Sequence, residues 1–194
     1  STLSLCCSAA VDASQGKCTP MARVAAGTID QIKRVLDAGA QGVLVPLVNT
    51  PEQAAEVVQF AKYPPEGVRG NGGMLPHLGF AANRVEYTAN ANKQTMVAIQ
   101  IETRQAVDNI EAILEVPGID CAFIGPNDLH ISYGFSPSYW TESGPFRDAV
   151  DRVLAACKRK GVIAGILCAN AAQAQARAAQ GFTFVGYGSD VGLM

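Results

Sequence analysis

The chain has 194 residues, a formal net charge of −2 and a hydrophobic content of 48%. This length suits one well-buried domain, which we expect to span residues 1–194, and it is short for two. Lysines and arginines form no run or stripe, which argues against a nucleic-acid partner. No apolar stretch is long enough to cross a bilayer and no signal peptide is recognisable, so we expect a cytoplasmic protein without a membrane partner.

Six cysteines raise the question of disulfide bonds. Cys6 and Cys7 are adjacent in a helical-looking segment, Cys121 and Cys168 lie in apolar strand-like runs, and Cys157 lies in an amphipathic helix. This placement predicts buried free thiols in a reducing compartment. Because there is no CxxC pair and there are only two histidines, a zinc site is disfavoured.

Short apolar runs bounded by Gly, Pro or polar residues have the character of buried strands. They are Met21–Val24, Gly42–Pro46, Met96–Ile101, Cys121–Ile124, Val162–Leu167 and Phe182–Gly186. Strands that are apolar throughout are typical of a parallel sheet covered on both faces.

Amphipathic segments with helix start and stop signals separate these runs. The Thr50-Pro51 pair, for example, combines a capping side chain with a proline in the first turn. The expected helices cover residues 3–13, 28–36 (ended by Gly39), 50–61, 103–114, 143–160 and 170–180, with another helix between a long loop and the third strand.

Strands that alternate with helices indicate βαβ units, hence an α/β fold that is either a doubly wound sheet or a (β/α)8 barrel. Only six strands are countable, and the chain opens on a helix that should follow a strand. A complete barrel takes about 250 residues. We therefore expect an incomplete TIM barrel, with its first strands and its last helix missing from this chain.

In both architectures the chemistry lies at the carboxyl ends of the strands. Glu102 and Asp128 end consecutive strands, and because neighbouring strands lie about 4.8 Å apart, both carboxylates can reach one ion. Such an oxygen-rich site suits Mg²⁺ or Mn²⁺. Gln100 points to the same side of its strand as Glu102, and Arg23 ends the first strand with a fork that suits a carboxylate substrate.

Simpler explanations exist for each of these residues. Glu102 would suit the acidic first turn of a helix, residues 125–128 an Asx turn, and Arg23 a surface ion pair. The glycine-rich residues 70–73 lack the strand–turn–helix context of a phosphate loop. The other chemically capable residues stand alone and are interpreted as bystanders: His77, His130 and Cys168.

Four segments, in family order, resemble the HpcH/HpaI family of metal-dependent class II pyruvate aldolases. They are residues 36–46 (LDAGAQGVLVP), 63–70 (YPPEGVRG), 97–104 (VAIQIETR) and 123–129 (FIGPNDL). The resemblance implies a (β/α)8 barrel, a homo-oligomer such as a hexamer or trimer of dimers, and a divalent Mg²⁺, Mn²⁺ or Co²⁺ ion. The implied substrates are a 2-oxo acid, pyruvate or oxaloacetate, and an aldehyde.

The family's motifs also imply a role for individual residues. The metal ligands would be Glu102 and Asp128. Arg23 would bind the pyruvyl oxygens and stabilise the enolate. The remaining substrate contacts would come from Gln100, Gly125, Pro126 and Asn127, with Leu167 lining the aldehyde pocket.

Two departures from the family pattern keep alternatives open. The family's Asp-x-Glu-His motif, which carries an acid–base histidine, is absent from this sequence, and the loop at residues 74–80 has no clear basic residue for a distal substrate carboxylate. The alternatives are an oxaloacetate decarboxylase or macrophomate-synthase-like enzyme on the same scaffold, and a non-catalytic incomplete barrel that binds a metal and a 2-oxo acid.

Overall fold

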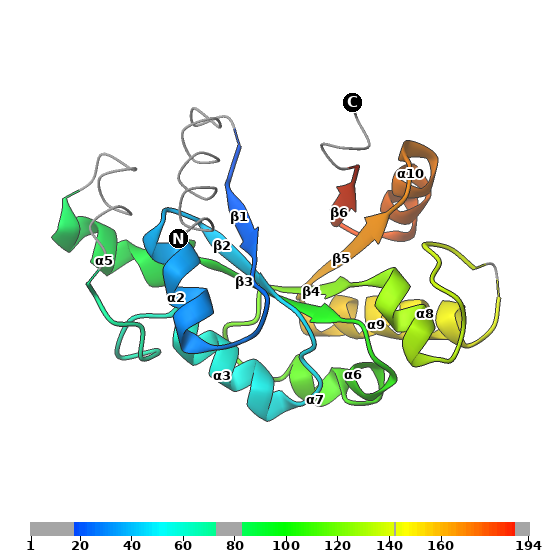
Figure 1. Cartoon of the computed structure of the whole chain (residues 1–194), viewed down its shortest axis with the longest axis horizontal. Helices are drawn as coiled ribbons and strands as arrows, with labels where there is room; N and C mark the ends of the chain where they lie inside the picture. Colours follow the sequence, from blue (N-terminus) through cyan, green and yellow to red (C-terminus); the bar gives the residue numbers. More distant parts are fainter. Residues whose placement is uncertain (1–17, 73–82, 142, 189–194) are drawn as a thin grey trace.

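A parallel sheet, whose strands pair in the order of the sequence, forms the centre of the fold (Figure 1). The computed structural model describes residues 18–72, 83–141 and 143–188. The expected helix at residues 3–13, Cys6, Cys7 and His77 lie outside the described residues. The strands are β1 (Met21–Arg23), β2 (Gly42–Val45), β3 (Met96–Ile101), β4 (Cys121–Ile124), β5 (Ile163–Cys168) and β6 (Phe184–Tyr187).

The six-stranded sheet curls like an arc of a barrel, with every neighbouring pair parallel (Figure 1). A doubly wound sheet reverses its strand order at a switch point, whereas here the order β1 to β6 is sequential. The prediction of a parallel α/β fold of the TIM-barrel kind is therefore confirmed for this arc, and the doubly wound alternative is wrong.

Helices connect the strands and begin where the sequence signals placed them. Thr50 accepts a hydrogen bond from the Gln53 amide at 3.3 Å, and Asn170 accepts one from the Gln173 amide at 3.0 Å. The helices are α2 (Ile29–Asp37), α3 (Pro51–Ala61), α5 (Arg84–Gln94), α6 (Arg104–Asp108), α7 (Ile110–Ile113), α8 (Pro126–Ser132), α9 (Pro145–Lys160) and α10 (Ala171–Gln180).

One predicted helix and one alternative interpretation were wrong. The single helix expected over residues 103–114 is two helices, α6 and α7, that meet at Asn109. The Asn109 side-chain amide donates to the Asn49 carbonyl at 2.8 Å, which ties this residue to the end of β2 at the break. Residues 125–128, weighed as a turn, are the start of α8, with Gly125 as the N-cap and Pro126 in the first turn.

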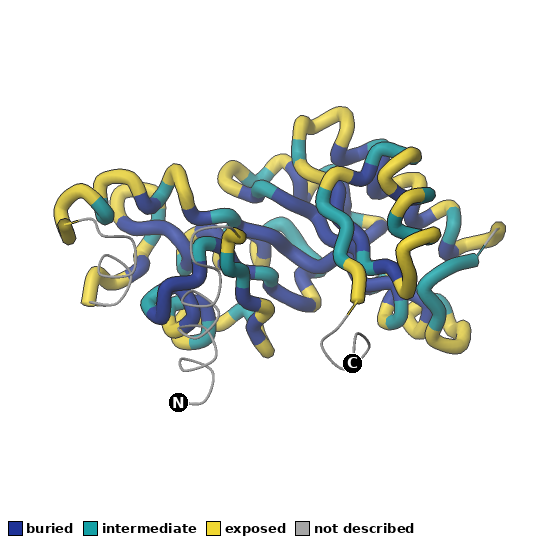
Figure 2. Tube along the Cα trace, turned by 90° about the horizontal axis from the view of Figure 1, so that it is seen from above, coloured by how far each residue is buried: buried dark blue, intermediate teal, exposed yellow. Residues whose placement is uncertain are grey.

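Side chains on the central strands alternate between two buried faces. On β3, Val97, Ile99 and Ile101 pack in the main core against the helices. Ala98 faces the inside of the curl with Cys121 and Phe123, and partly buried hydrophobic side chains complete this inner cluster: Met21, Leu44, Met96, Leu167 and Phe184. The central strands are consequently buried along most of their length (Figure 2), as expected for a parallel sheet.

Phe123 fills the inside of the curl because β5 and β6 present glycines to it. A Cβ atom on Gly165 would lie 2.5 Å from Phe123 Cδ2, and one on Gly186 would lie 3.2 Å from Phe123 Cζ. The ring also contacts Phe184 edge to face, with 5.6 Å between the centroids. The bulky ring on β4 is thus accommodated because the facing residues on β5 and β6 are glycines.

Gly165→Ala tests this packing. The added methyl group has no room beside Phe123, so we expect a loss of about 1–3 kcal/mol in the free energy of unfolding, measured by urea denaturation. Gly72→Ala is the control, because a Cβ atom there meets nothing within 4 Å. The smaller side chain of Phe123→Leu should recover part of the loss in the double variant. Equal stability of Gly165→Ala and Gly72→Ala would contradict the account.

Candidate functional site

The carboxyl ends of β1, β2, β3 and β4 meet at one rim of the curl. Arg23 is the last residue of β1, Gln100 lies near the end of β3, Glu102 follows that strand, and Gly125 follows β4. Because these strands pair in order and run parallel, their last residues are brought to the same edge. The fold therefore brings Arg23, Gln100, Glu102 and Gly125 to one rim, four of the residues that were predicted to form a site.

Hydrogen bonds join three of these side chains in a row. Arg23 Nε donates to Gln100 Oε1 at 2.6 Å, and Gln100 Nε2 donates to Glu102 Oε2 at 3.0 Å. The Gln100 amide therefore lies between the guanidinium and the carboxylate and fixes both. Among the described residues, no hydrogen bond uses the Arg23 Nη atoms, which remain available at the exposed rim.

Glu102 is a buried carboxylate, with 2% of its surface exposed. Burial raises its pKa above the ordinary value, and nearby Asp128 raises it further, while the hydrogen bond from Leu47 and the charge of Arg23 lower it. Glu102 precedes Thr103, which caps α6 by accepting from the Ala106 amide at 3.1 Å. The alternative role of Glu102 in the first turn of a helix is therefore wrong.

Leu47 supplies the other partner of Glu102, and sequence reasoning missed it. Its backbone N–H donates to Glu102 Oε1 at 2.9 Å. Leu47 has a φ of 56°, the one positive φ at a residue other than glycine in the described parts of the chain. A left-handed conformation costs a residue with a Cβ atom about 1–2 kcal/mol. No residue-type signal announces it, because leucine is not a residue that favours this region.

Gly125 allows β4 to approach this carboxylate closely. A Cβ atom at this position would lie 2.5 Å from Glu102 Oε2 and 3.2 Å from Gln100 Nε2. Any side chain here would therefore displace the two groups. Pro126 is buried next to Gly125, while Asn127 is half-buried and Asp128 is exposed at the start of α8.

Leu167 and the isolated candidates lie apart from the hydrogen-bonded row. Leu167 is partly buried on the inner face of β5, within the cluster around Phe123. Both ring nitrogens of His130 are occupied, Nδ1 by the Pro126 carbonyl at 2.8 Å and Nε2 by Thr141 Oγ1 at 2.7 Å, and the ring stacks on Phe146. His130 is thus a packed side chain, as interpreted from the sequence.

The described cysteines are free thiols: Cys121, Cys157 and Cys168 are buried, and Cys18 is exposed. Burial raises the pKa of Cys121 and of Cys157 to about 12 and also raises that of Cys168. A thiol with so high a pKa is a poor nucleophile at neutral pH. These values agree with the prediction of buried, unreactive cysteines.

The donor set at the rim fits a hard divalent cation. The charge of nearby Asp128 raises the pKa of Glu102, and in the parts of the chain that the structure describes neither carboxylate forms an ion pair with a basic side chain. A bound cation would neutralise this repulsion. The described residues contain no cluster of three or more His, Cys, Asp or Glu side chains suited to a metal.

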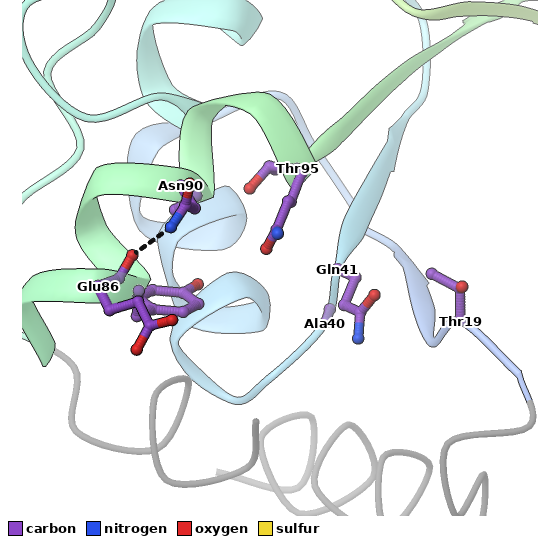
Figure 3. A pocket seen from close by; sticks show the side chains of 9 residues that line it. Thr19, Ala40, Gln41, Glu86, Asn90 and Thr95 are labelled. Carbon is purple, nitrogen blue, oxygen red and sulfur yellow. Dashed lines mark hydrogen bonds between the residues drawn. The ribbon is translucent and has the colours of Figure 1, made fainter. Parts of the chain in front are cut away.

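A cavity lies at the opposite end of the strands. It has a volume of about 520 Å³, and its lining includes Thr19, Gln41 and Thr95, which precede β1, β2 and β3 (Figure 3). Asn90 and Glu86 of α5 border it and are joined by a hydrogen bond of 2.9 Å. Residues at the amino ends of barrel strands contribute to stability more than to chemistry. The candidate site is therefore the rim around Glu102.

A family model described as HpcH/HpaI aldolase/citrate lyase matches residues 6–194. A hydroxypyruvate/pyruvate aldolase of Chromohalobacter salexigens is 37% identical over 179 residues, which cover 91% of this chain and 69% of the relative. A 2-keto-3-deoxy-L-rhamnonate aldolase of Salmonella schwarzengrund is 39% identical over 178 residues, covering 90% of this chain and 64% of the relative. The chain thus spans roughly two thirds of the length of these relatives.

The fold comparison leads to the same family. The crystal structure of an HpcH/HpaI aldolase from Desulfitobacterium hafniense superposes with a TM-score of 0.84 and 31% identity, over 93% of this chain and 70% of that one.

No helix in the described residues has the length and apolar character needed to cross a membrane.

The raised pKa of Glu102 predicts how the stability of the metal-free chain depends on pH. The native carboxyl keeps its proton to a higher pH than the same carboxyl in the unfolded chain. Above the ordinary pKa of 4.5, the native state therefore binds more protons than the unfolded state does. Stability due to this group is present below that pH and is lost as pH rises through the raised native pKa.

Urea denaturation in EDTA from about pH 4 to about pH 7 measures this effect. We expect the unfolding free energy of the wild type, minus that of Glu102→Gln, to fall across the range. Glu56→Gln on α3 serves as the control, with a flatter difference, because Glu56 is exposed and forms no ion pair among the described residues. A difference that rises with pH at position 102 would contradict the burial argument.

Proposed function

The chain belongs to the HpcH/HpaI aldolase/citrate lyase family and is a lyase of the pyruvate-aldolase class, and we propose that Glu102 and Asp128 hold the divalent cation of its active site. The observation that carries this proposal is the buried Glu102 carboxylate, desolvated at the rim beside a second carboxylate. Mg²⁺, Mn²⁺ and Co²⁺ are the candidate ions.

The reaction that we propose breaks or forms a carbon–carbon bond next to a 2-oxo acid. The cation, when bound, would act as a Lewis acid on the oxygens of the substrate. Arg23 would donate from its free Nη atoms to the substrate oxygen on which negative charge develops, and its hydrogen bond to Gln100 holds it in place for this. Gln100 therefore acts by positioning Arg23 and Glu102.

The start of α8 would contact the carboxylate of the 2-oxo acid, with Asn127 donating its backbone N–H and with Gly125 and Pro126 in van der Waals contact, since Pro126 has no N–H. Leu167, on the inner face of β5, would line the place of the aldehyde. By analogy with the hydroxypyruvate/pyruvate aldolase relative, the 2-oxo acid is pyruvate or hydroxypyruvate. Oxaloacetate, as implied by the family resemblance, is a further substrate in this proposal. Assembly as a hexamer or trimer of dimers in the cytoplasm belongs to the same proposal.

Oxaloacetate decarboxylation tests the metal and arginine roles without requiring a general base. The C3–C4 bond breaks, CO₂ leaves, the electron pair moves into the C2–C3 enolate, and water protonates C3 to give pyruvate. With Mn²⁺ we expect Glu102→Gln, Asp128→Asn and Arg23→Lys each to lower the rate about 100-fold, because each change removes charge or alignment from the enolate. Pyruvate formation coupled to NADH oxidation by lactate dehydrogenase measures the rate.

Mn²⁺ alone decarboxylates oxaloacetate slowly, so the metal-only rate is subtracted. Glu56→Gln, which changes an exposed carboxylate on α3, should keep the wild-type rate. Cleavage of a 4-hydroxy-2-oxo acid to pyruvate and an aldehyde, measured in parallel, separates an aldolase from a decarboxylase. A Glu102→Gln variant with full metal-dependent activity would refute the assignment.

A further inference from the structure

The Leu47–Glu102 hydrogen bond depends on a backbone conformation that Leu47 does not favour. Its φ of 56° lies in the left-handed region, and its side chain is 56% exposed, so packing of the leucine itself does little to hold it there. Another group is needed to hold the turn after β2, in which the N–H of Leu47 donates to Glu102 Oε1.

Asn49 is the residue placed to do this. Its Nδ2 donates to the Leu47 carbonyl at 3.0 Å, and its Oδ1 accepts a hydrogen bond from Thr103 Oγ1. Leu47 is two residues before Asn49, and Thr103 directly follows Glu102. One amide side chain therefore bridges the two segments that carry the donor and the acceptor of the Leu47–Glu102 bond.

The backbone of Asn49 is fixed as well. Its N–H donates to Gln53 Oε1 at 2.7 Å, and its carbonyl accepts from Asn109 Nδ2 at 2.8 Å. Gln53 lies in α3, and Asn109 lies at the break between α6 and α7. The half-buried Asn49 is thus anchored at all four of its polar groups.

We propose that Asn49 is a positioning residue of the active site, which holds Leu47 in the left-handed conformation so that its N–H orients the Glu102 carboxylate for the cation. The inference rests on the proposed role of Glu102 as a metal ligand. Groups that orient a metal ligand typically change metal affinity by about 10-fold to 100-fold when removed. Asn49 itself touches neither metal nor substrate in this account.

Mn²⁺ binding, followed by the electron paramagnetic resonance signal of the free ion, tests the proposal without measuring activity. We expect Asn49→Ala to raise the Kd for Mn²⁺ at least about 10-fold, with circular dichroism verifying that the variant is folded. Asn49→Asp keeps the size and the acceptor for Thr103 but loses the donor to Leu47, so its Kd should rise too. Asn90→Ala, an exposed asparagine on α5, is the control and should bind as the wild type does.

A second substitution separates positioning from a general structural role. Glycine adopts positive φ without cost, so Leu47→Gly should bind Mn²⁺ nearly as the wild type does, and Asn49→Ala combined with Leu47→Gly should recover most of the lost affinity. Recovery supports the proposal, because a variant that is merely less stable would not regain affinity by losing a leucine.

The failures of the two proposals are distinguishable. If the wild type does not bind Mn²⁺, or if Glu102→Gln binds it equally well, the proposed metal site is wrong and this inference fails with it. If Glu102→Gln abolishes binding while Asn49→Ala binds like the wild type, or if Leu47→Gly restores nothing, the metal site stands and the role of Asn49 is refuted.

Discussion

A buried carboxylate that forms no ion pair with a basic side chain in the described part of the chain governs the arrangement of this rim. Glu102 loses its hydration, and three neighbours compensate only in part: a backbone N–H from Leu47, an amide N–H from Gln100 and the more distant charge of Arg23. Asp128 opposes them. Charged groups held in this way clearly cost stability, and they are typical of functional sites. A bound divalent cation would offset the repulsion between the two carboxylates, which is the role that we propose for the metal.

Local features of the backbone serve the same carboxylate. The end of β2 places Leu47 in a left-handed conformation, and the end of β4 uses Gly125 because no side chain fits beside Glu102. Both features are unfavourable or unnecessary for the sheet itself. They become reasonable if the position of Glu102 is what matters, since backbone strain tends to occur where function requires it.

Much of the fold was predictable because its signals are local. The Thr50-Pro51 start, the Asn170 cap and the apolar run of β3 each depend on a few adjacent residues. Glu102 and Arg23 could be assigned to one rim because parallel strands end together. The left-handed Leu47, the bridging role of Gln100 and the helix break at Asn109 could not be predicted. Each depends on contacts between residues far apart in the sequence.

The central claim is that one cation lies between Glu102 and Asp128, within reach of Arg23. A crystal grown with Mn²⁺ and oxalate, an analogue of the pyruvate enolate, tests it most directly through the anomalous signal of manganese. The account predicts a single strong peak bonded to oxygens of both carboxylates, with oxalate against Arg23 and the backbone of residues 125–127. A peak elsewhere, or no peak at this rim with the oxalate bound, would contradict it.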